Sequence, residues 1–200
     1  MTTYAQDNED IILAEILKDV NKGFYIDIGA NSPDVISVTK LFYEQGWNGI
    51  NIEPLPDMYK ELCEKRDRDI NLNIGVGNKH NVLTMRVCDY GSTFSNKVIS
   101  ENHYENCPTI QVEVFTMAEV LNKHKPDTIH FCKIDVEGFE KQVLEGWDWN
   151  YRPMVFCMES TKPGTAIPCY DEWEYILLEH GYKLERSHGI NRYYVDINKF

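Results

Sequence analysis

Short apolar runs alternate with segments of helical periodicity along this chain. Residues 24–28 and 47–53 are apolar runs, and a segment typical of a helix follows each of them. Residues 8–20, ahead of the first run, place apolar side chains close to the 3.6-residue period of an amphipathic helix. Because strands that alternate with helices are typical of parallel sheets, the pattern predicts an α/β fold.

The same pattern continues toward the C-terminus. The last two predicted strands, 182–186 and 192–197, are joined by a turn at Gly189 with no helix between them, which predicts an antiparallel edge on a mostly parallel sheet. The other strands are expected at 70–76, 83–88, 110–115, 128–136 and 153–158, and the other helices at 32–46, 56–66, 117–124, 139–145 and 170–180.

The predicted helix at 32–46 has recognisable ends. Ser32 can act as the N-cap, Pro33 suits the first helical position, and Gly46 is a natural C-cap. Residues 89–108, by contrast, are mostly polar and show weak periodicity. A connection of about twenty residues exceeds the usual length, so we expect a lid or a binding loop there.

Size and composition limit the possible functions. No repeat or linker divides the 200 residues, so we expect a single domain over 1–200. The net charge of −12 argues against nucleic acid, which needs a basic surface. No apolar stretch approaches the roughly 20 residues of a membrane span, so we expect no membrane association.

The N-terminal segment indicates the subcellular compartment, and the compartment in turn indicates the state of the cysteines. Residues 1–15 are polar and acidic, unlike a secretory signal, so we expect a cytoplasmic and reducing location. In such a location cysteines are expected to be free thiols. No Cys-x-x-Cys pair indicates zinc among Cys63, Cys88, Cys107, Cys132, Cys157 and Cys169.

A glycine turn follows the first predicted strand. Asp27 lies near the end of that strand, Gly29 begins the turn, and Glu53 ends the next strand. Such a unit forms half of a Rossmann-like site for an adenosine-bearing cofactor, in which the carboxylate accepts hydrogen bonds from ribose hydroxyls. Ligands bind such sheets at the carboxyl ends of the strands, where this chain also places Asp135, Glu137 and Glu159.

These motifs, taken in order, resemble the FkbM branch of class I methyltransferases, which use S-adenosylmethionine. The resemblance covers roughly residues 4–159. Its motifs are Gln6 with Glu9-Asp10, residues 24–31 (FYIDIGAN), 46–54 (GWNGINIEP) and 133–140 (KIDVEGFE), and Arg152-Pro153 before a strand that ends in Glu159.

The resemblance implies a Rossmann-like three-layer sandwich with a mostly parallel seven-stranded sheet and an antiparallel edge strand. Many members carry a glycine where this chain has Pro33. A pyrophosphate would need that glycine, whereas S-adenosylmethionine has no phosphate, so the cofactor expectation is unchanged. The residues expected at the cofactor are Asp27 near the sulfonium and amino group, the turn residues Gly29, Ala30 and Asn31, Glu53 at the ribose, Pro54 beside it, Gly75 and Val76 near the adenine, and Gln6 and Asp10 at the mouth.

Methyl transfer to a hydroxyl needs a group that takes the proton. Asp135 is the first candidate for this general base and Glu137 the second, while Glu159 could orient the acceptor. Lys133 would need a pKa lowered by burial, which Asp135 beside it opposes. A structural ion pair between Lys133 and Asp135 is the alternative interpretation. Asp135 and Glu159 are too few carboxylates to indicate a metal, and we expect none.

The sequence therefore predicts an S-adenosylmethionine-dependent O-methyltransferase whose acceptor is a hydroxyl of a sugar, a glycan or a related small natural product. One alternative is an oxidoreductase with a nucleotide cofactor, although the further glycines of a dinucleotide site are missing. Another is a non-catalytic Rossmann-like module attached to a glycosyltransferase. A glycosyltransferase, fused or separate, is also the protein partner that we expect.

Overall fold

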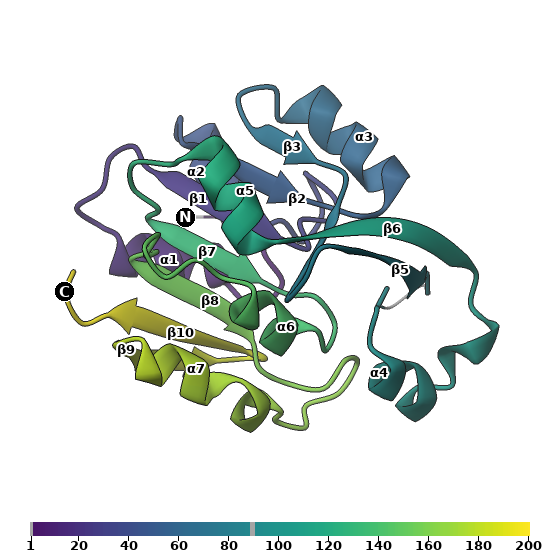
Figure 1. Cartoon of the computed structure of the whole chain (residues 1–200). Helices are drawn as coiled ribbons and strands as arrows, with labels where there is room; N and C mark the ends of the chain where they lie inside the picture. The colour runs from purple at the N-terminus through teal and green to yellow at the C-terminus, as the bar shows by residue number, and fades with distance from the viewer. Residues whose placement is uncertain (1, 89–90) are drawn as a thin grey trace.

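The computed structural model describes residues 2–88 and 91–200, and its centre is a twisted seven-stranded sheet (Figure 1). Five neighbouring strands are parallel, and β10 is antiparallel to both of its neighbours. This arrangement confirms the predicted α/β fold with a mostly parallel sheet and an antiparallel hairpin at one edge. The order across the sheet is β3 (Ile70–Leu72), β2 (Asn48–Ile52), β1 (Phe24–Ile28), β7 (Phe131–Ile134), β8 (Val155–Glu159), β10 (Asn191–Asp196) and β9 (Tyr182–His188).

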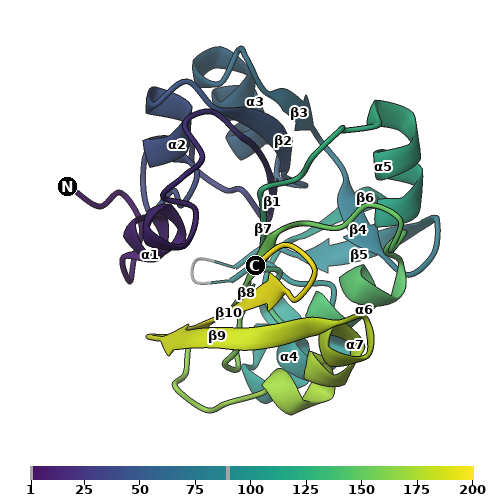
Figure 2. The same cartoon turned by 90° about the vertical axis from the view of Figure 1, so that its left-hand side faces the viewer.

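Helices cover both faces of this sheet and make three layers (Figure 2). Alternate residues of β1 point to opposite faces, so Tyr25 packs with one layer, and Ile26 and Ile28 pack with the other. The first layer holds α1 (Glu9–Ile16) and α2 (Lys40–Glu44), and the second holds α5 (Met117–His124), α6 (Glu140–Glu145) and α7 (Glu174–Glu179), which follows the short helix η2 (Tyr170–Glu172).

The sequence predicted α5 to the residue, and its N-terminus shows why. Thr116 accepts a hydrogen bond from the Glu119 amide, and the Glu119 carboxylate accepts one from the Thr116 amide. This reciprocal capping box satisfies amides that the first helical turn leaves free. Proline in the first turn starts α3 (Pro56–Lys65) in a comparable way, close to the predicted range.

The predicted strand at 70–76 is wrong in one respect, because it divides into two strands of different sheets. After β3, the Asn73 side chain donates to the carbonyl oxygens of Glu53 and Pro54 at 2.9 and 3.0 Å. The chain then leaves the main sheet, and β4 (Gly75–Gly77) pairs with β6 (Thr109–Thr116). With β5 (Asn81–Arg86) these strands form a three-stranded sheet.

The predicted helix at 32–46 is shorter than expected. The Ser32 hydroxyl accepts from the amides of Asp34 and Val35, so the capping group is present. However, Ile36 adopts a left-handed φ of +55°, which a continuing helix does not permit, and α2 begins only at Lys40.

The loop at 89–108 contains short helices, and the prediction that all cysteines are free is wrong. Its described part contains α4 (Asn96–Glu101) and the short helix η1 (Tyr104–Asn106), while residues 89–90 lie outside the described residues. A disulfide joins Cys88 to Cys107 and closes the base of this loop. The two cysteines are 19 positions apart, and the pairing of the surrounding segments, which spacing alone does not reveal, brings their Cα atoms within 5.7 Å.

Among the helices of residues 2–88 and 91–200, none combines the length and apolar character needed to cross a bilayer.

Candidate active site

The turn after β1 lies where the ends of three strands meet. Gly29 and Ala30 donate their amides to the Ile52 carbonyl oxygen at the end of β2. Gly29 has a φ of +78°, and a Cβ at this position would lie 1.9 Å from the Asp135 carbonyl oxygen beyond β7. Both conditions require glycine. The turn is therefore held tightly between the ends of β2 and β7.

Glu53 closes the other side of this turn. Its side chain is 4% exposed, and its two oxygens accept hydrogen bonds from the Asn31 amide at 2.7 Å and the Leu55 amide at 2.8 Å. Burial raises the pKa of this carboxyl, although the two amides oppose the shift. A carboxylate has about four acceptor sites, so Glu53 keeps capacity for ribose hydroxyls.

Asp27 and Lys133 form a buried pair beneath the turn. The Lys133 ammonium donates to the Gly29 carbonyl oxygen at 2.7 Å and lies 3.5 Å from Asp27 and 3.4 Å from Asp135. Asp27, only 1% exposed, also accepts from the Thr39 hydroxyl at 3.0 Å. All of these contacts are internal, so contact between Asp27 and the cofactor stays a prediction.

The same contacts argue against Lys133 as the general base. Burial would lower the pKa of this ammonium, but the carboxylates of Asp135 and Asp27 outweigh burial and raise the pKa above its usual value. Lys133 therefore stays protonated. The structural ion pair that the sequence left open is the role that the geometry supports.

Three carboxylates meet at the carboxyl edge of β7 and β8. Asp135 follows β7, Glu137 lies in the next turn, and Glu159 ends β8. One oxygen of each lies within 4.8 Å of the others. The side chain of Asp135 is 37% exposed, whereas Glu159 is 7% exposed. The sequence predicted this edge, and the structure brings all three predicted residues together.

Two of these carboxylates hold protons more tightly than usual. Burial, followed by the negative charges of Asp135 and Glu140, raises the pKa of Glu137 to about 8. Burial, followed by the charge of Asp135, raises the pKa of Glu159 well above its ordinary value. A carboxylate with a pKa near neutrality suits proton transfer in catalysis.

The turn that carries Glu137 is braced from two sides. Glu137 has a left-handed φ of +53°, and its carbonyl oxygen accepts from the Thr93 hydroxyl at 2.8 Å. The Glu140 carboxylate, buried at the start of α6, accepts from the amides of Val136 and Gly138 at 3.2 Å each. The predicted site residues did not include Thr93 or Glu140, because their role in bracing this turn depends on contacts that only the fold creates.

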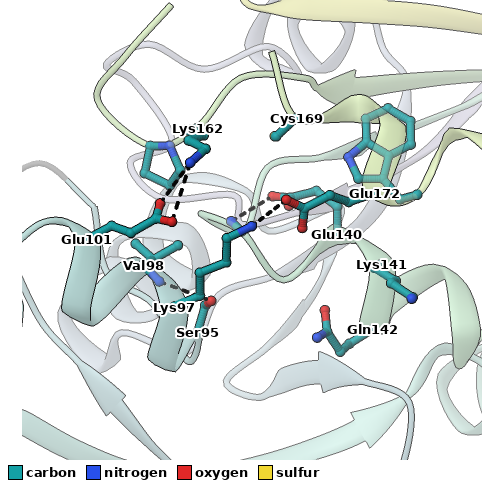
Figure 3. A pocket seen from close by; sticks show the side chains of 13 residues that line it. Ser95, Lys97, Val98, Glu101, Glu140, Lys141, Gln142, Lys162, Cys169 and Glu172 are labelled. Atoms are coloured by element: carbon teal, nitrogen blue, oxygen red, sulfur yellow. Dashed lines mark hydrogen bonds and ion pairs between the residues drawn. The ribbon is translucent and has the colours of Figure 1, made fainter. Parts of the chain in front are cut away.

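A cavity of about 160 Å³ lies beside this turn, and Gly138 and Glu140 line it (Figure 3). Two ion pairs join α4 to the segments after β8: Lys97 with Glu172 at 2.5 Å, and Lys162 with Glu101 at 3.1 Å. The sequence did not single out these residues, since exposed lysines and glutamates in loops give no signal by themselves.

Of the N-terminal motif, Glu9 lies close to the carboxyl edge of β8, whereas Asp10 has contacts within its own segment. Glu9 accepts at 2.7 Å from the side chain of Asn191, which pairs with Glu159 across β10 and β8. Gln6, three positions before Glu9, is exposed. The Asp10 carboxylate instead accepts from the Thr3 hydroxyl and the Tyr4 amide at 2.7 Å each, so it fastens the N-terminal segment.

The predicted adenine-side residues lie in the small sheet. Gly75 and Val76 are buried in β4. A Cβ on Gly75 would meet the Phe94 ring at 2.9 Å, so the aromatic residue of the 89–108 loop packs directly on this glycine. Pro54, between β2 and α3, is partly buried.

One family model covers most of this chain. The model of the family described as "Methyltransferase FkbM domain" matches residues 27–184. The crystal structure of precorrin-6y C5,15-methyltransferase from Geobacter metallireducens GS-15 aligns with 93% of this chain and 85% of that chain, at 14% sequence identity and a TM-score of 0.44. The search of curated proteins gave no match.

Proposed function

The chain belongs to the FkbM family of S-adenosylmethionine-dependent methyltransferases, and we propose that it transfers the methyl group to a hydroxyl of a sugar, a glycan or a related small natural product. One observation carries this proposal. The Gly29 turn and Glu53, suited to the donor, lie at the same edge of the sheet as Asp135, Glu137 and Glu159, suited to the hydroxyl.

The donor is proposed to lie across the ends of β1 and β2. Its ribose hydroxyls donate to Glu53, and the backbone of residues 29–31 contacts its amino-acid part. Pro54, Gly75 and Val76 lie on the adenine side, and Gln6 lies at the mouth. Asp27 acts on the sulfonium and amino group of the donor from beneath the turn, where Lys133 shares its charge.

The reaction is an in-line displacement. The bond between sulfur and the methyl carbon breaks as the acceptor oxygen forms a bond to that carbon, and S-adenosylhomocysteine leaves. The hydroxyl proton passes to a carboxylate, a transfer typically worth about 10²–10⁴-fold in rate. The Asp135 side chain is 37% exposed and therefore more accessible to an acceptor than Glu159, which is 7% exposed. Burial raises the pKa of Glu137 to about 8, so Glu137 holds a proton firmly once its ionised form has accepted it. Glu159 orients the acceptor.

The charged groups in the mixed lining of the cavity beside the turn support a hydroxylated acceptor. Its lining offers ammonium and carboxylate groups, which suit sugar hydroxyls and charged substituents better than an apolar ligand. We propose that the acceptor enters between α4 and α6 and reaches Asp135 past Gly138.

A screen of acceptors tests the proposal. The protein is incubated with S-adenosylmethionine and nucleotide sugars or free glycans, and S-adenosylhomocysteine release is measured by mass spectrometry. Release with at least one acceptor, lost in Asp135→Ala and retained in the surface variant Glu64→Gln, supports the proposal. Full turnover by Asp135→Ala with that acceptor would reject the catalytic role of Asp135.

Two other proposals from the sequence need separate tests. A non-catalytic module would bind the donor without releasing product, and titration calorimetry with S-adenosylmethionine and a nicotinamide cofactor separates it from an oxidoreductase. Several other expectations also stay predictions: a single domain over 1–200, a glycosyltransferase partner, no nucleic-acid or membrane association, and a cytoplasmic location. The Cys88–Cys107 disulfide bears on the predicted cytoplasmic location, because such bonds are rare in the cytosol.

A further inference from the structure

Among the described residues, the carboxylate cluster of Asp135, Glu137 and Glu159 forms an ion pair only between Asp135 and Lys133. Lys133 is the cation beside it, at 3.4 Å from Asp135, but its ammonium also serves Asp27 and the Gly29 carbonyl oxygen. If all three were ionised together, they would share part of one positive charge. Burying carboxylates in this way is costly unless another partner binds them.

Glu159 gives the second and independent sign of a missing partner. Its side chain is more than nine-tenths buried, with 7% exposed, and its buried Oε2 has no hydrogen-bond partner. Oε2 of Glu137 is also buried without a partner. In folded proteins, most buried polar atoms are paired, so each of these oxygens needs an explanation.

The spacing of the oxygens identifies a suitable partner. One oxygen from each carboxylate lies within 4.8 Å of the other two. Oxygen ligands of Mg²⁺ or Ca²⁺ lie about 2.0–2.6 Å from the ion, so ligands on opposite sides of one ion are about 4–5 Å apart. Small movements of the side chains would close this cluster around a single ion.

We propose that Asp135, Glu137 and Glu159 bind one hard divalent cation such as Mg²⁺, Mn²⁺ or Ca²⁺. All three ligands are carboxylate oxygens, the donors that these ions prefer over softer metals. The sequence analysis counted only Asp135 and Glu159 and expected no metal. The left-handed backbone of Glu137 turns its carboxylate back toward them, which adds the third ligand.

The frame around the cluster is suitable for a metal site. Ile134 and Met158 are paired in the parallel register of β7 and β8, so Asp135 and Glu159 occupy matching positions just beyond this pair. Thr93 and Glu140 fix the backbone of the Glu137 turn. Three protein ligands leave coordination positions open for water or for a ligand.

The consequence for catalysis rests on the proposed function. A cation at this position would bind the acceptor hydroxyl, lower its pKa and hold its oxygen toward the methyl group. The hydroxyl proton would pass to the free oxygen of Asp135 or Glu137, and the methyl group would move from sulfur to oxygen as described above. Cation binding itself does not depend on that function.

The experiment measures cation binding directly. The full chain is treated with a chelator, dialysed, and titrated with Mn²⁺ by electron paramagnetic resonance and with Mg²⁺ and Ca²⁺ by calorimetry. We expect one site per chain. Glu159→Gln should weaken binding by at least about tenfold, since even residues behind the ligands change metal affinity by about 10–100-fold. The exposed Glu64→Gln should bind like the wild type.

Thermal unfolding provides a second readout. The cation should raise the midpoint temperature of the wild type and leave that of Glu159→Gln unchanged. Without cation, Glu159→Gln should be at least as stable as the wild type, because a neutral amide of the same size replaces a buried carboxyl whose Oε2 has no hydrogen-bond partner. No binding, or equal binding by Glu159→Gln and the wild type, would overturn the inference. Chelator-treated protein that still methylates at the full rate would overturn the catalytic role of the cation while leaving the proposed function intact. Cation binding without methyl transfer would support the site and count against the function.

Discussion

Replacing Gly29 by alanine tests whether the turn and the carboxylate cluster form one unit. The substitution forces a residue with a Cβ into a φ of +78°, which costs about 1–2 kcal/mol. The new Cβ also meets the Asp135 carbonyl oxygen at 1.9 Å. Ordinary contact begins near 3.4 Å, so one of the two must move by about 1.5 Å. Overpacking of this kind adds about 1–3 kcal/mol.

Gly29→Ala should therefore lower the free energy of unfolding by about 2–5 kcal/mol, measured by urea denaturation. Gly164→Ala is the matched control. Gly164 has a φ of +66° with nothing within 4 Å of an added Cβ, so its replacement costs only the backbone part, about 1–2 kcal/mol.

The same variant should weaken S-adenosylmethionine binding, measured by calorimetry at a temperature where both proteins are folded. The clash moves the turn relative to Asp135, and with it the backbone proposed to hold the donor. Gly164→Ala should bind the donor like the wild type. The reasoning fails if the two alanine variants lose the same stability, or if Gly29→Ala binds the donor with unchanged affinity.

Three further predictions concern the charges and the disulfide. Lys133→Met leaves the buried Asp27 without its cation and should cost about 3–5 kcal/mol in urea denaturation; a cost below about 1 kcal/mol would contradict the pairing. Burial lowers the pKa of His130, so the unfolded chain binds the proton more readily, and stability should decline as the pH falls below about 6.5. His130→Gln should reduce this decline between pH 7.5 and 5.5, and an unchanged pH dependence would refute the assignment. Reduction of the Cys88–Cys107 disulfide, or its double replacement by serine, should lower stability by about 3 kcal/mol, and equal stability of reduced and oxidised protein would contradict the structural role.

The sequence predicted those features that local patterns determine. β1 and α5 agree with their predicted ranges because an apolar run and a capping box act within a few residues. The carboxyl edge of the sheet was predictable for a related reason. In a parallel sheet, residues at the ends of successive strands meet at one edge whatever the loops do, and this brought Asp135 and Glu159 together.

Features that depend on distant contacts could not be predicted. The helix after the Gly29 turn begins late because Ile36 turns left-handed, although Ser32 and Pro33 are suitable helix-start residues. Arg66 contributes to this outcome, since its guanidinium donates to the Pro33 carbonyl oxygen at 2.6 Å and holds the segment in its irregular path. Local helix signals do not record a contact 33 positions away.

The roles within the site show the same limit. The sequence already showed that Asp135 opposes a role of Lys133 as a base, but it did not reveal the second partner, Asp27, which lies on the neighbouring strand β1 and also raises the pKa of Lys133. Glu137 was considered only as a second base. The turn that brings its carboxylate to Glu159 is fixed by Thr93, which lies 44 positions away along the chain.

A crystal structure with bound S-adenosylhomocysteine tests the central claim most directly. The account predicts both ribose hydroxyls within about 2.6–3.2 Å of the Glu53 oxygens, and the sulfur facing Asp135 at the carboxyl edge of the sheet. A ligand bound at another place, with Glu53 contacting only the amides of Asn31 and Leu55, would contradict the account.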